Sequence, residues 1–380
     1  MKRIIALLLA TLMVLTLFTA CGKSSGASGT TAASSGETTA AASGETTAAA
    51  SSGAKKTVGI CMPTKEQTIW SIQGARLEEA FQAAGYDTKI EYAEDDSAKQ
   101  VMQIENMITK GVNVLVIAAV DCAALTDACE KAKAAGILVI ADDRLITNTQ
   151  AVDYYVTFDL VHLGEMQGQY IADKLDLENK SGPFTLEIFS GSQDDTNSIS
   201  FYKGAMSILQ PYIDSGKLVV KSGQIEYTAT AIQSWDSSKA QSRMDNLLSG
   251  YYSDTHLDAV LVAADCLAVG VISSLESMGY GTDSQPFPIV TGQDAELAAV
   301  KNILAGKQSM TVFLDAHKLA DIVVPLVTSL LNGEKVDPDL TYNNGVFEVP
   351  TKTYDPYLID KDNVDYLTEV GFYTKEEIHG

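Results

Sequence analysis

Short apolar segments alternate with amphipathic segments from Thr57 to Phe313, and this alternation restricts the fold more than any other feature of the sequence. Short apolar runs are typical of buried strands, whereas apolar residues three and four positions apart, as at Val101, Ile104 and Ile108, indicate helices. The apolar runs predict about ten strands. These strands span residues 57–62, 88–92, 114–120, 137–141, 154–158, 184–189, 218–222, 259–262, 289–291 and 310–313.

Strands that alternate with helices predict parallel sheets that are covered by helices on both faces. About ten strands are too many for one compact α/β unit, and 380 residues are enough for roughly two domains. We therefore expect an α/β fold with two similar, doubly wound, parallel-sheet lobes.

The N-terminus has the pattern of a secretory signal peptide, in which Lys2 and Arg3 precede a long apolar run. The run ends at Cys21 in a sequence that resembles a bacterial lipobox, with Phe18 in place of the usual Leu. We predict that residues 1–20 are a lipoprotein signal peptide and that Cys21 is lipidated. The alternative is a plain signal peptide followed by an incidental cysteine.

Residues 21–56 are rich in Ser, Thr, Gly and Ala and contain the octet Ser-Gly-Glu-Thr-Thr-Ala-Ala-Ala twice in tandem. Such a segment cannot bury enough apolar surface to offset the entropy of ordering it. It predicts a disordered tether that holds the globular part at the extracytoplasmic face of a cell membrane. A tether behind a lipid anchor suggests a Gram-positive surface.

The formal net charge of −22 predicts a surface that repels nucleic acid and anionic lipid headgroups. The histidines lack zinc-ligand spacing, and the sequence contains no P-loop, GxGxxG or GxSxG motif. The cysteines after Cys21 lack CxxC spacing, which favours free thiols. We expect no cofactor, no metal site and no nucleic-acid partner.

Charged side chains recur directly after the predicted strands, where the carboxyl ends of parallel strands collect ligands. Asp143 and Arg144 are the clearest case, because Asp accepts hydrogen bonds from hydroxyl groups and Arg donates several in a rigid fork. This pair suits a small polyhydroxylated molecule such as a sugar. The other charged residues at strand ends are Lys65, Asp121, Asp194, Asp195, Asp265 and Asp294. A single Asp at such a place is often only the N-cap of the next helix, but the recurrence favours a binding edge.

The two tryptophans, Trp70 and Trp235, lie in polar segments that we interpret as loops, where burial in a core is not expected. The apolar C–H faces of an aldose ring stack on aromatic planes, so the tryptophans are candidates to hold a sugar ring. The alternative is that both are ordinary core or surface aromatics.

Several segments together resemble the type I periplasmic sugar-binding proteins, the solute-binding components of monosaccharide ABC importers, and within them the multiple-sugar-binding branch. The matching segments are Thr57–Lys65, Gln103–Gly111, Asp143–Ile146, Gly204–Met206, Ala240–Leu248 and Val290–Asp294. The resemblance implies two α/β lobes joined by three hinge crossovers. It places residues 57–158 and 315–344 in the N-terminal lobe and residues 159–314 and 345–380 in the C-terminal lobe.

The resemblance also implies which residues bind the sugar between the lobes. Trp70 and Trp235 would stack on the ring, and Asn197 would lie on the C-terminal side of the cleft beside Asp195. With the charged residues at the strand ends, the expected ligand-binding set is Lys65, Trp70, Asp121, Asp143, Arg144, Asp195, Asn197, Trp235, Asp265 and Asp294.

Three positions depart from the family pattern towards apolar residues. Ile69 replaces a frequent Arg, Ala264 replaces a frequent Asn, and Leu314 stands where Asn, Gln or Lys is common. Each unmade buried hydrogen bond costs about 1–3 kcal/mol. We therefore expect a less hydroxylated, deoxy, methylated or otherwise altered sugar, or a ligand of unusual shape.

The resemblance implies a monomeric, non-enzymatic receptor that captures a monosaccharide and delivers it to an ABC permease. One alternative is a sensor that presents the sugar to a chemoreceptor or histidine kinase. Another is a carbohydrate-processing enzyme that uses two carboxylates of the cleft.

Overall fold

The computed structural model describes residues 55–380. The predicted signal peptide at residues 1–20, the lipidation site Cys21 and residues 22–54 of the predicted tether lie outside the described residues and stay predictions. Within the described part, no helix is both long enough and apolar enough to cross a membrane.

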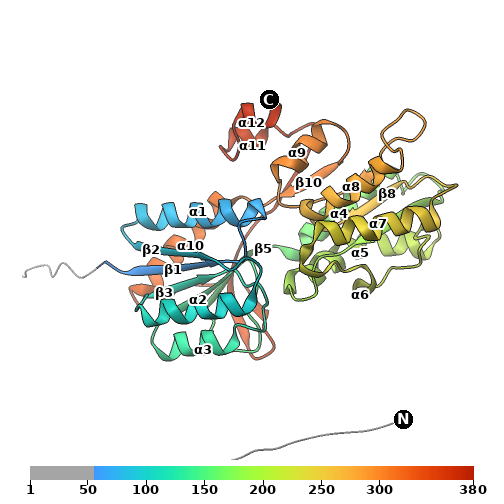
Figure 1. Cartoon of the computed structure of the whole chain (residues 1–380). Coiled ribbons are helices and arrows are strands. Elements are labelled where there is room, and N and C mark those ends of the chain that lie inside the picture. Colours follow the sequence, from blue (N-terminus) through green and yellow to red (C-terminus); the bar gives the residue numbers. More distant parts are fainter. Residues whose placement is uncertain (1–54) are drawn as a thin grey trace, which may run out of the picture. The chain divides into compact units, whose positions relative to one another are not determined.

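The N-terminal lobe is built on a seven-stranded sheet with the strand order β11-β12-β5-β4-β3-β1-β2 (Figure 1). Neighbouring strands are parallel except for β11, which pairs antiparallel with β12. The strands are β1 (Thr57–Met62), β2 (Asp87–Tyr92), β3 (Val114–Ile117), β4 (Leu138–Asp142), β5 (Tyr154–Phe158), β11 (Leu340–Asn343) and β12 (Glu348–Tyr354). The helices are α1 (Thr68–Ala83), α2 (Ser97–Thr109), α3 (Thr126–Ala134) and α10 (Ala316–Leu331).

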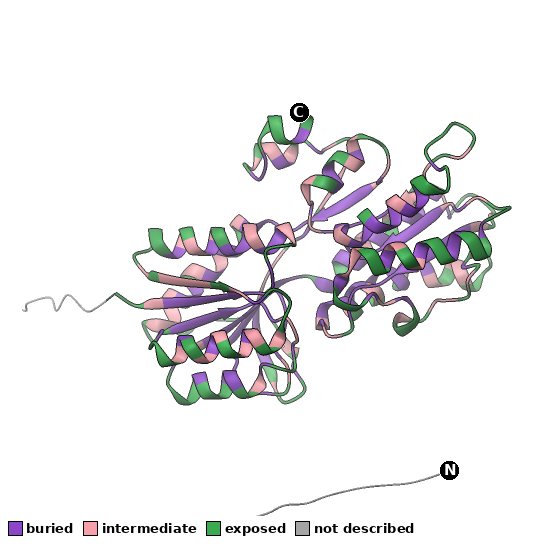
Figure 2. Cartoon of the chain, viewed as in Figure 1, coloured by how far each residue is buried: buried purple, intermediate pink, exposed green. Residues whose placement is uncertain are grey.

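Both faces of this sheet are buried, α1 and α10 covering one and α2 and α3 the other. Side chains alternate along a strand, so Val114 and Val116 of β3 face α1 and α10, while Leu115 and Ile117 face α2 and α3. Figure 2 shows the buried strands between helices whose outer sides are exposed. Burial on both faces explains why these strands are continuous apolar runs in the sequence.

The C-terminal lobe contains a parallel four-stranded sheet, in the order β7-β6-β8-β9, and an antiparallel pair of β10 with β13. A bridge between Gln293 and Val312 joins the two. The strands are β6 (Phe184–Phe189), β7 (Leu218–Val219), β8 (Ala259–Val262), β9 (Ile289–Val290), β10 (Met310–Phe313) and β13 (Tyr357–Asp360). The helices are α4 (Leu160–Leu175), α5 (Thr196–Asp214), α6 (Tyr227–Thr230), η1 (Gln233–Trp235), α7 (Ser237–Tyr251), α8 (Asp265–Ser277), α9 (Leu297–Leu304), α11 (Tyr366–Glu369) and α12 (Lys375–His379).

Helices α4 and α5 touch backbone to backbone. A Cβ atom at Gly164 of α4 would lie 2.0 Å from the carbonyl oxygen of Phe201, and one at Gly204 of α5 would lie 2.0 Å from that of Val161. Glycine is needed at both positions because no other residue permits this approach. Helix α4 starts directly after β5, so this contact ties α5 to the first crossover between the lobes.

The chain crosses between the lobes three times, from β5 to α4, from β10 to α10 and from β12 to β13. The α/β fold with two lobes and three crossovers is therefore confirmed. Five predicted strands have the observed bounds, whereas those predicted at residues 114–120 and 218–222 end earlier.

The predicted lobe boundary near the C-terminus is wrong. We expected residues 345–380 in the C-terminal lobe, but β12 pairs with β5 in the N-terminal sheet, so the last crossover follows Tyr354. Strands β11, β12 and β13 were not predicted at all. The sequence of β12 is rich in polar residues and contains Pro350, which is rare within a sheet, so its pattern does not indicate a strand.

Candidate binding site

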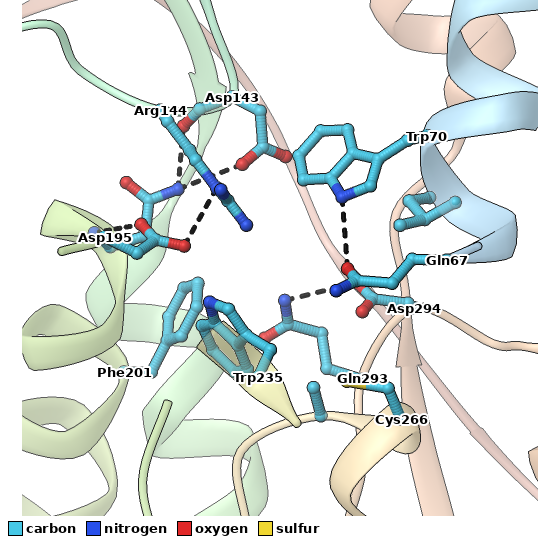
Figure 3. Close-up of a pocket in the computed structure, with 13 residues that line it drawn as sticks. Gln67, Trp70, Asp143, Arg144, Asp195, Phe201, Trp235, Cys266, Gln293 and Asp294 are labelled. Atoms are coloured by element: carbon cyan, nitrogen blue, oxygen red, sulfur yellow. Dashed lines mark hydrogen bonds and ion pairs between the residues drawn. The ribbon is translucent and has the colours of Figure 1, made fainter. Parts of the chain in front are cut away.

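Loops and helix starts at the strand ends of both lobes surround a pocket that contains about 380 Å³ of empty space, including open solvent at its mouth (Figure 3). The N-terminal lobe contributes side chains from the start of α1 and from the loop after β4. The C-terminal lobe contributes side chains from α5, η1, the start of α8 and the loop after β9. The lining residues are Gln67, Ile69, Trp70, Asp143, Arg144, Asp195, Asn197, Phe201, Trp235, Ala264, Cys266, Gln293 and Asp294.

Asp143 lies at the point where the two lobes meet, in the left-handed backbone region with a φ of 61°. Its carbonyl oxygen accepts hydrogen bonds from the Tyr155 hydroxyl (2.5 Å), the Thr157 hydroxyl (3.2 Å) and the Asn197 amide (2.7 Å). The same amide nitrogen donates to the Asp143 carboxylate at 3.1 Å. Because a residue other than glycine is disfavoured at positive φ, these bonds hold a conformation that aims the carboxylate into the pocket.

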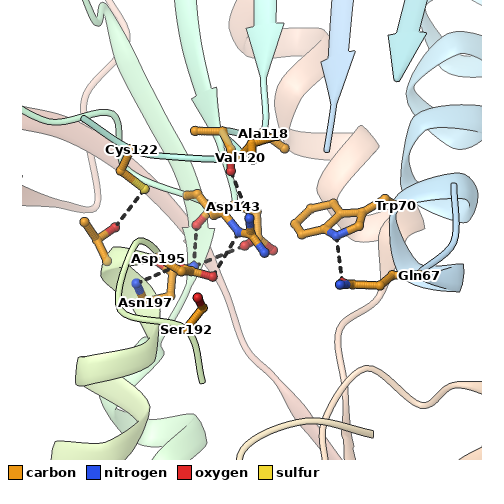
Figure 4. Close-up of polar contacts among 12 residues, drawn as sticks. Gln67, Trp70, Ala118, Val120, Cys122, Asp143, Ser192, Asp195 and Asn197 are labelled. Carbon is orange, nitrogen blue, oxygen red and sulfur yellow. Dashed lines mark hydrogen bonds and ion pairs between the residues drawn. The ribbon is translucent and has the colours of Figure 1, made fainter. Parts of the chain in front are cut away.

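Arg144 links the lobes through Asp195, which caps α5 by accepting a hydrogen bond from the backbone N–H of Asn197 (Figure 4). Arg144 Nε lies 2.9 Å from Asp195 Oδ2, an ion pair in which the N–H does not point at the oxygen. Arg144 also donates to the carbonyl of Ala119 at 2.9 Å, and its guanidinium lies 4.9 Å from the ring centroid of Trp70. These contacts fix the guanidinium on the pocket wall.

A second contact between the lobes lies beside this ion pair. The backbone N–H of Cys122 donates to the carbonyl of Asp194 at 3.4 Å, and the Cys122 thiol lies 3.6 Å from the hydroxyl of Thr196 (Figure 4). The start of α5 therefore touches the N-terminal lobe directly on this side of the pocket.

Asp294 lies on the opposite wall of the pocket and also has a positive φ, of 94°. Its backbone N–H donates a hydrogen bond to the carbonyl oxygen of Val312 at 2.8 Å. Its loop is supported from behind by the fully buried Asp265. Asp265 accepts hydrogen bonds from the backbone of Glu296 (3.0 Å), the amide of Gln308 (2.7 Å) and the hydroxyl of Thr311 (2.8 Å). A Cβ at Gly292 would lie 2.0 Å from Asp265 Oδ1, so the chain passes over this carboxylate only because residue 292 is glycine.

Both tryptophans line the pocket, but their settings differ from the prediction. Trp70 lies on helix α1 rather than in a loop, and its indole N–H donates to Gln67 at 3.1 Å. Trp235 lies in the short turn η1. The side chains are nearly buried, with 4% and 8% exposed, and each packs into the apolar core of its own lobe. The expectation that they avoid core burial is therefore wrong, because one tryptophan can form a core and a pocket wall together.

Seven predicted ligand-binding residues line the pocket, and Lys65, Asp121 and Asp265 do not. Lys65 lies outside, with its ammonium 4.6 Å from the ring centroid of Tyr92. Asp121 accepts hydrogen bonds from the backbone of Ala123 and Ala124, the turn-capping role weighed as the alternative. Asp265 supports the Asp294 loop without reaching the pocket.

Four further residues line the pocket and were not predicted from the sequence: Gln67, Phe201, Cys266 and Gln293. Two signals were available, since Phe201 follows Asn197 by one helical turn and Gln293 directly precedes Asp294. Of the three apolar departures, Ile69 and Ala264 line the pocket, whereas Leu314 is buried in the core.

Burial dominates the electrostatics of the two pocket carboxylates. It raises the pKa of Asp143 to about 7, an effect that Arg144 opposes and Asp195 increases. Burial also raises the pKa of Asp294 to about 7, and the nearby Glu296 adds to the shift. Both groups therefore change charge near neutral pH.

We predict that Asp143→Asn becomes more stable relative to the wild type as pH rises from 5 to 7. The folded-state pKa of Asp143 lies above the unfolded value near 4, so the wild type binds a proton more tightly when folded and loses that stability as pH rises through about 7. Asn stays neutral and tolerates positive φ. The expected change is on the order of 1 kcal/mol per pH unit.

Urea unfolding at pH 5, 6, 7 and 8 measures this difference. Asp127→Asn, at an exposed position on α3, is the control. A stability difference between Asp143→Asn and the wild type that does not change with pH would contradict the prediction.

We also predict that Asp265→Ala lowers the free energy of unfolding by several kcal/mol, because it leaves two buried donors and one partly buried donor unpaired at about 1–3 kcal/mol each. Thermal and urea unfolding measure the loss. Asp121→Ala, which removes a partly exposed turn cap, should cost only about 1 kcal/mol. Equal losses in the two variants would show that Asp265 does not support the loop.

Comparisons with known proteins agree with this geometry. The sequence pattern of the periplasmic binding protein domain family matches residues 58–335. The multiple sugar-binding periplasmic receptor ChvE of Rhizobium radiobacter is 50% identical over 327 residues, which cover 85% of this chain and 92% of that protein. The D-xylose-binding periplasmic protein of Haemophilus influenzae is 36% identical over 299 residues, 78% of this chain and 84% of that protein.

Among solved structures, an ABC transporter solute-binding protein from Clostridium phytofermentans with bound β-D-glucose superposes with a TM-score of 0.82. It is 44% identical in sequence, and the match covers 85% of this chain and all of that one.

Proposed function

We propose that this chain, which belongs to the periplasmic binding protein domain family, is an extracytoplasmic receptor that binds a monosaccharide and delivers it to an ABC import permease. The observation that carries the proposal is the pocket between the lobes. It combines hydroxyl acceptors in Asp143 and Asp294, donors in Arg144 and Asn197, and two indoles. The 44%-identical protein solved with β-D-glucose supports a sugar as the ligand.

In this proposal, Asp143 and Asp294 accept hydrogen bonds from sugar hydroxyls, and Arg144 donates to sugar oxygens. The indoles of Trp70 and Trp235 cover the apolar faces of the ring. A sugar that contacts both lobes would favour a closed form, in which the lobes come together around it, over an open form in which they lie apart. A ligand shifts such an equilibrium only by its differential affinity for the two forms. The relatives named above are a sugar-binding receptor, a sugar-binding protein and a solute-binding protein, and no chemical step is assigned to the pocket.

The apolar side chains Ile69 and Ala264 support a ligand with an edge that lacks a hydroxyl group. Leu314 no longer contributes to this argument, because it lies in the core. We therefore expect the pocket to discriminate among aldoses rather than to bind all of them tightly.

Isothermal titration calorimetry with D-glucose, D-galactose, L-arabinose and D-xylose tests whether the pocket binds a monosaccharide and whether it discriminates among aldoses. Trp70→Ala and Asp294→Ala should each weaken binding of the preferred sugar by more than tenfold, or about 1.4 kcal/mol. Lys65→Met, which changes a residue outside the pocket, should leave the affinity unchanged. Wild-type affinity in both pocket variants would mean that the site lies elsewhere, and submicromolar affinity for all four sugars would exclude an altered sugar as the intended ligand.

We further propose that Cys21 carries a lipid that anchors the receptor through the segment up to residue 56. The support is the signal-peptide pattern and the lipobox-like sequence before Cys21. Expressed in a Gram-positive host, the wild type should fractionate with membranes, whereas Cys21→Ser should be released into the medium. Mass spectrometry of the N-terminal peptide identifies the lipid, and an unmodified Cys21 on membrane-bound protein would contradict the proposal.

A further inference from the structure

Gln293 places a buried, unpaired acceptor on the pocket wall. Its side chain is 6% exposed, and its Oε1 atom has no hydrogen-bond partner among residues 55–380. Such an atom is costly to leave unpaired. Figure 3 shows the carboxamide of Gln293 among the pocket side chains, near Trp235 and Asp294.

The orientation of this carboxamide is determined by its neighbour. The Gln293 Nε2 atom donates to Asp294 Oδ1 at 3.2 Å. Turning the amide over would bring its oxygen against the ionised carboxylate of Asp294. Neither oxygen could then donate a hydrogen bond to the other. The nitrogen therefore stays on Asp294, and the oxygen remains free to accept.

The backbone of Gln293 is held as well. Its carbonyl accepts from the backbone N–H of Asp265 at 3.0 Å, and the residue forms a bridge with Val312 of β10. Asp265 and Gly292 fix the loop from behind, as described above. The acceptor is thus already in place before a ligand arrives, which reduces the entropy lost on binding.

Two other polar groups lie near Gln293, the carboxylate of Asp294 and the indole Nε1 of Trp235, which is unpaired among the described residues, and of these only the carboxylate can accept a hydrogen bond. Ala264, two residues before Cys266 at the start of α8, has no polar side-chain atom, and Asp265 between them turns away into the core. A ligand hydroxyl that points at this wall therefore has the carboxylate of Asp294 and the Oε1 atom of Gln293 as its acceptors.

We propose that Gln293 is a specificity-determining residue, whose Oε1 accepts a hydrogen bond from one particular hydroxyl of the ligand. This inference rests on the proposed function and narrows it. The ligand is a sugar with a free hydroxyl at that position, and sugars in which this hydroxyl is removed, methylated or esterified are rejected. A site built around a buried acceptor rejects analogues that leave it unpaired.

The test uses the full chain and a parent sugar, either D-glucose or D-xylose, whichever binds more tightly. Each hydroxyl of the parent is replaced in turn by hydrogen or by fluorine. Fluorine keeps the size of the group but cannot donate a hydrogen bond. In the wild type, the deoxy and fluoro analogues at one position should both bind about 10- to 100-fold more weakly than the parent.

Gln293→Met keeps the length of the side chain and removes the acceptor. It should bind the parent about 10- to 100-fold more weakly than the wild type does, yet bind the deoxy and fluoro analogues at that one position as tightly as the parent. Gln67→Met is the matched control, because Gln67 also lines the pocket but its oxygen is already paired with Trp70. It should weaken all sugars together and keep the wild-type preference. Unchanged thermal midpoints for the unliganded variants exclude misfolding.

The outcomes separate the two proposals. A wild type that binds the parent, together with a Gln293→Met variant that keeps its affinity or its ranking of analogues, would overturn the role of Gln293 alone. A wild type that binds neither D-glucose nor D-xylose would overturn the proposed receptor function for these aldoses and the inference with it.

Discussion

The site depends on one backbone oxygen, the carbonyl of Asp143. Donors from β5 and from α5 converge on it. A single atom therefore connects the carboxyl ends of the strands of the N-terminal sheet with the C-terminal lobe. Without those bonds, Asp143 has no reason to stay in the left-handed region, and its carboxylate would no longer face the pocket. The neighbouring pair of Arg144 and Asp195 adds a charge interaction across the same junction.

The two walls of the pocket use the same physical device. Each presents an Asp at positive φ in the loop that follows a strand, and each holds that conformation with buried polar groups behind it. At Asp143 the support is a hydroxyl pair from β5, and at Asp294 it is the carboxylate of Asp265. Desolvation of the presented carboxylates raises their pKa towards neutrality, so their binding strength and their protonation are coupled.

The fold class could be predicted because strands buried on both faces must be continuous apolar runs, as in β3. Strand β12 could not be predicted, since it is polar and contains Pro350. The predicted lobe boundary was therefore placed before β12, whereas the structure has it after β12. Asp143 and Asp294 could be predicted from their places after strands. The same local pattern occurs at Asp121 and Asp265, and no sequence signal tells whether such a side chain faces a ligand, a turn or a core. Gln293 was missed because a glutamine beside an aspartate has no distinctive pattern, and its importance appears only when its oxygen is found buried without a partner.

The close approach of α4 and α5 has a mechanical consequence. Helix α4 begins where the chain leaves β5, and the first residues of α5 carry the groups that meet Asp143 and Arg144. With no side chain between them at Gly164 and Gly204, the backbones of the two helices pack in direct contact. A rotation of α4 about its junction with β5 would therefore move α5 with it, together with the residues at the start of α5 that contact Asp143 and Arg144.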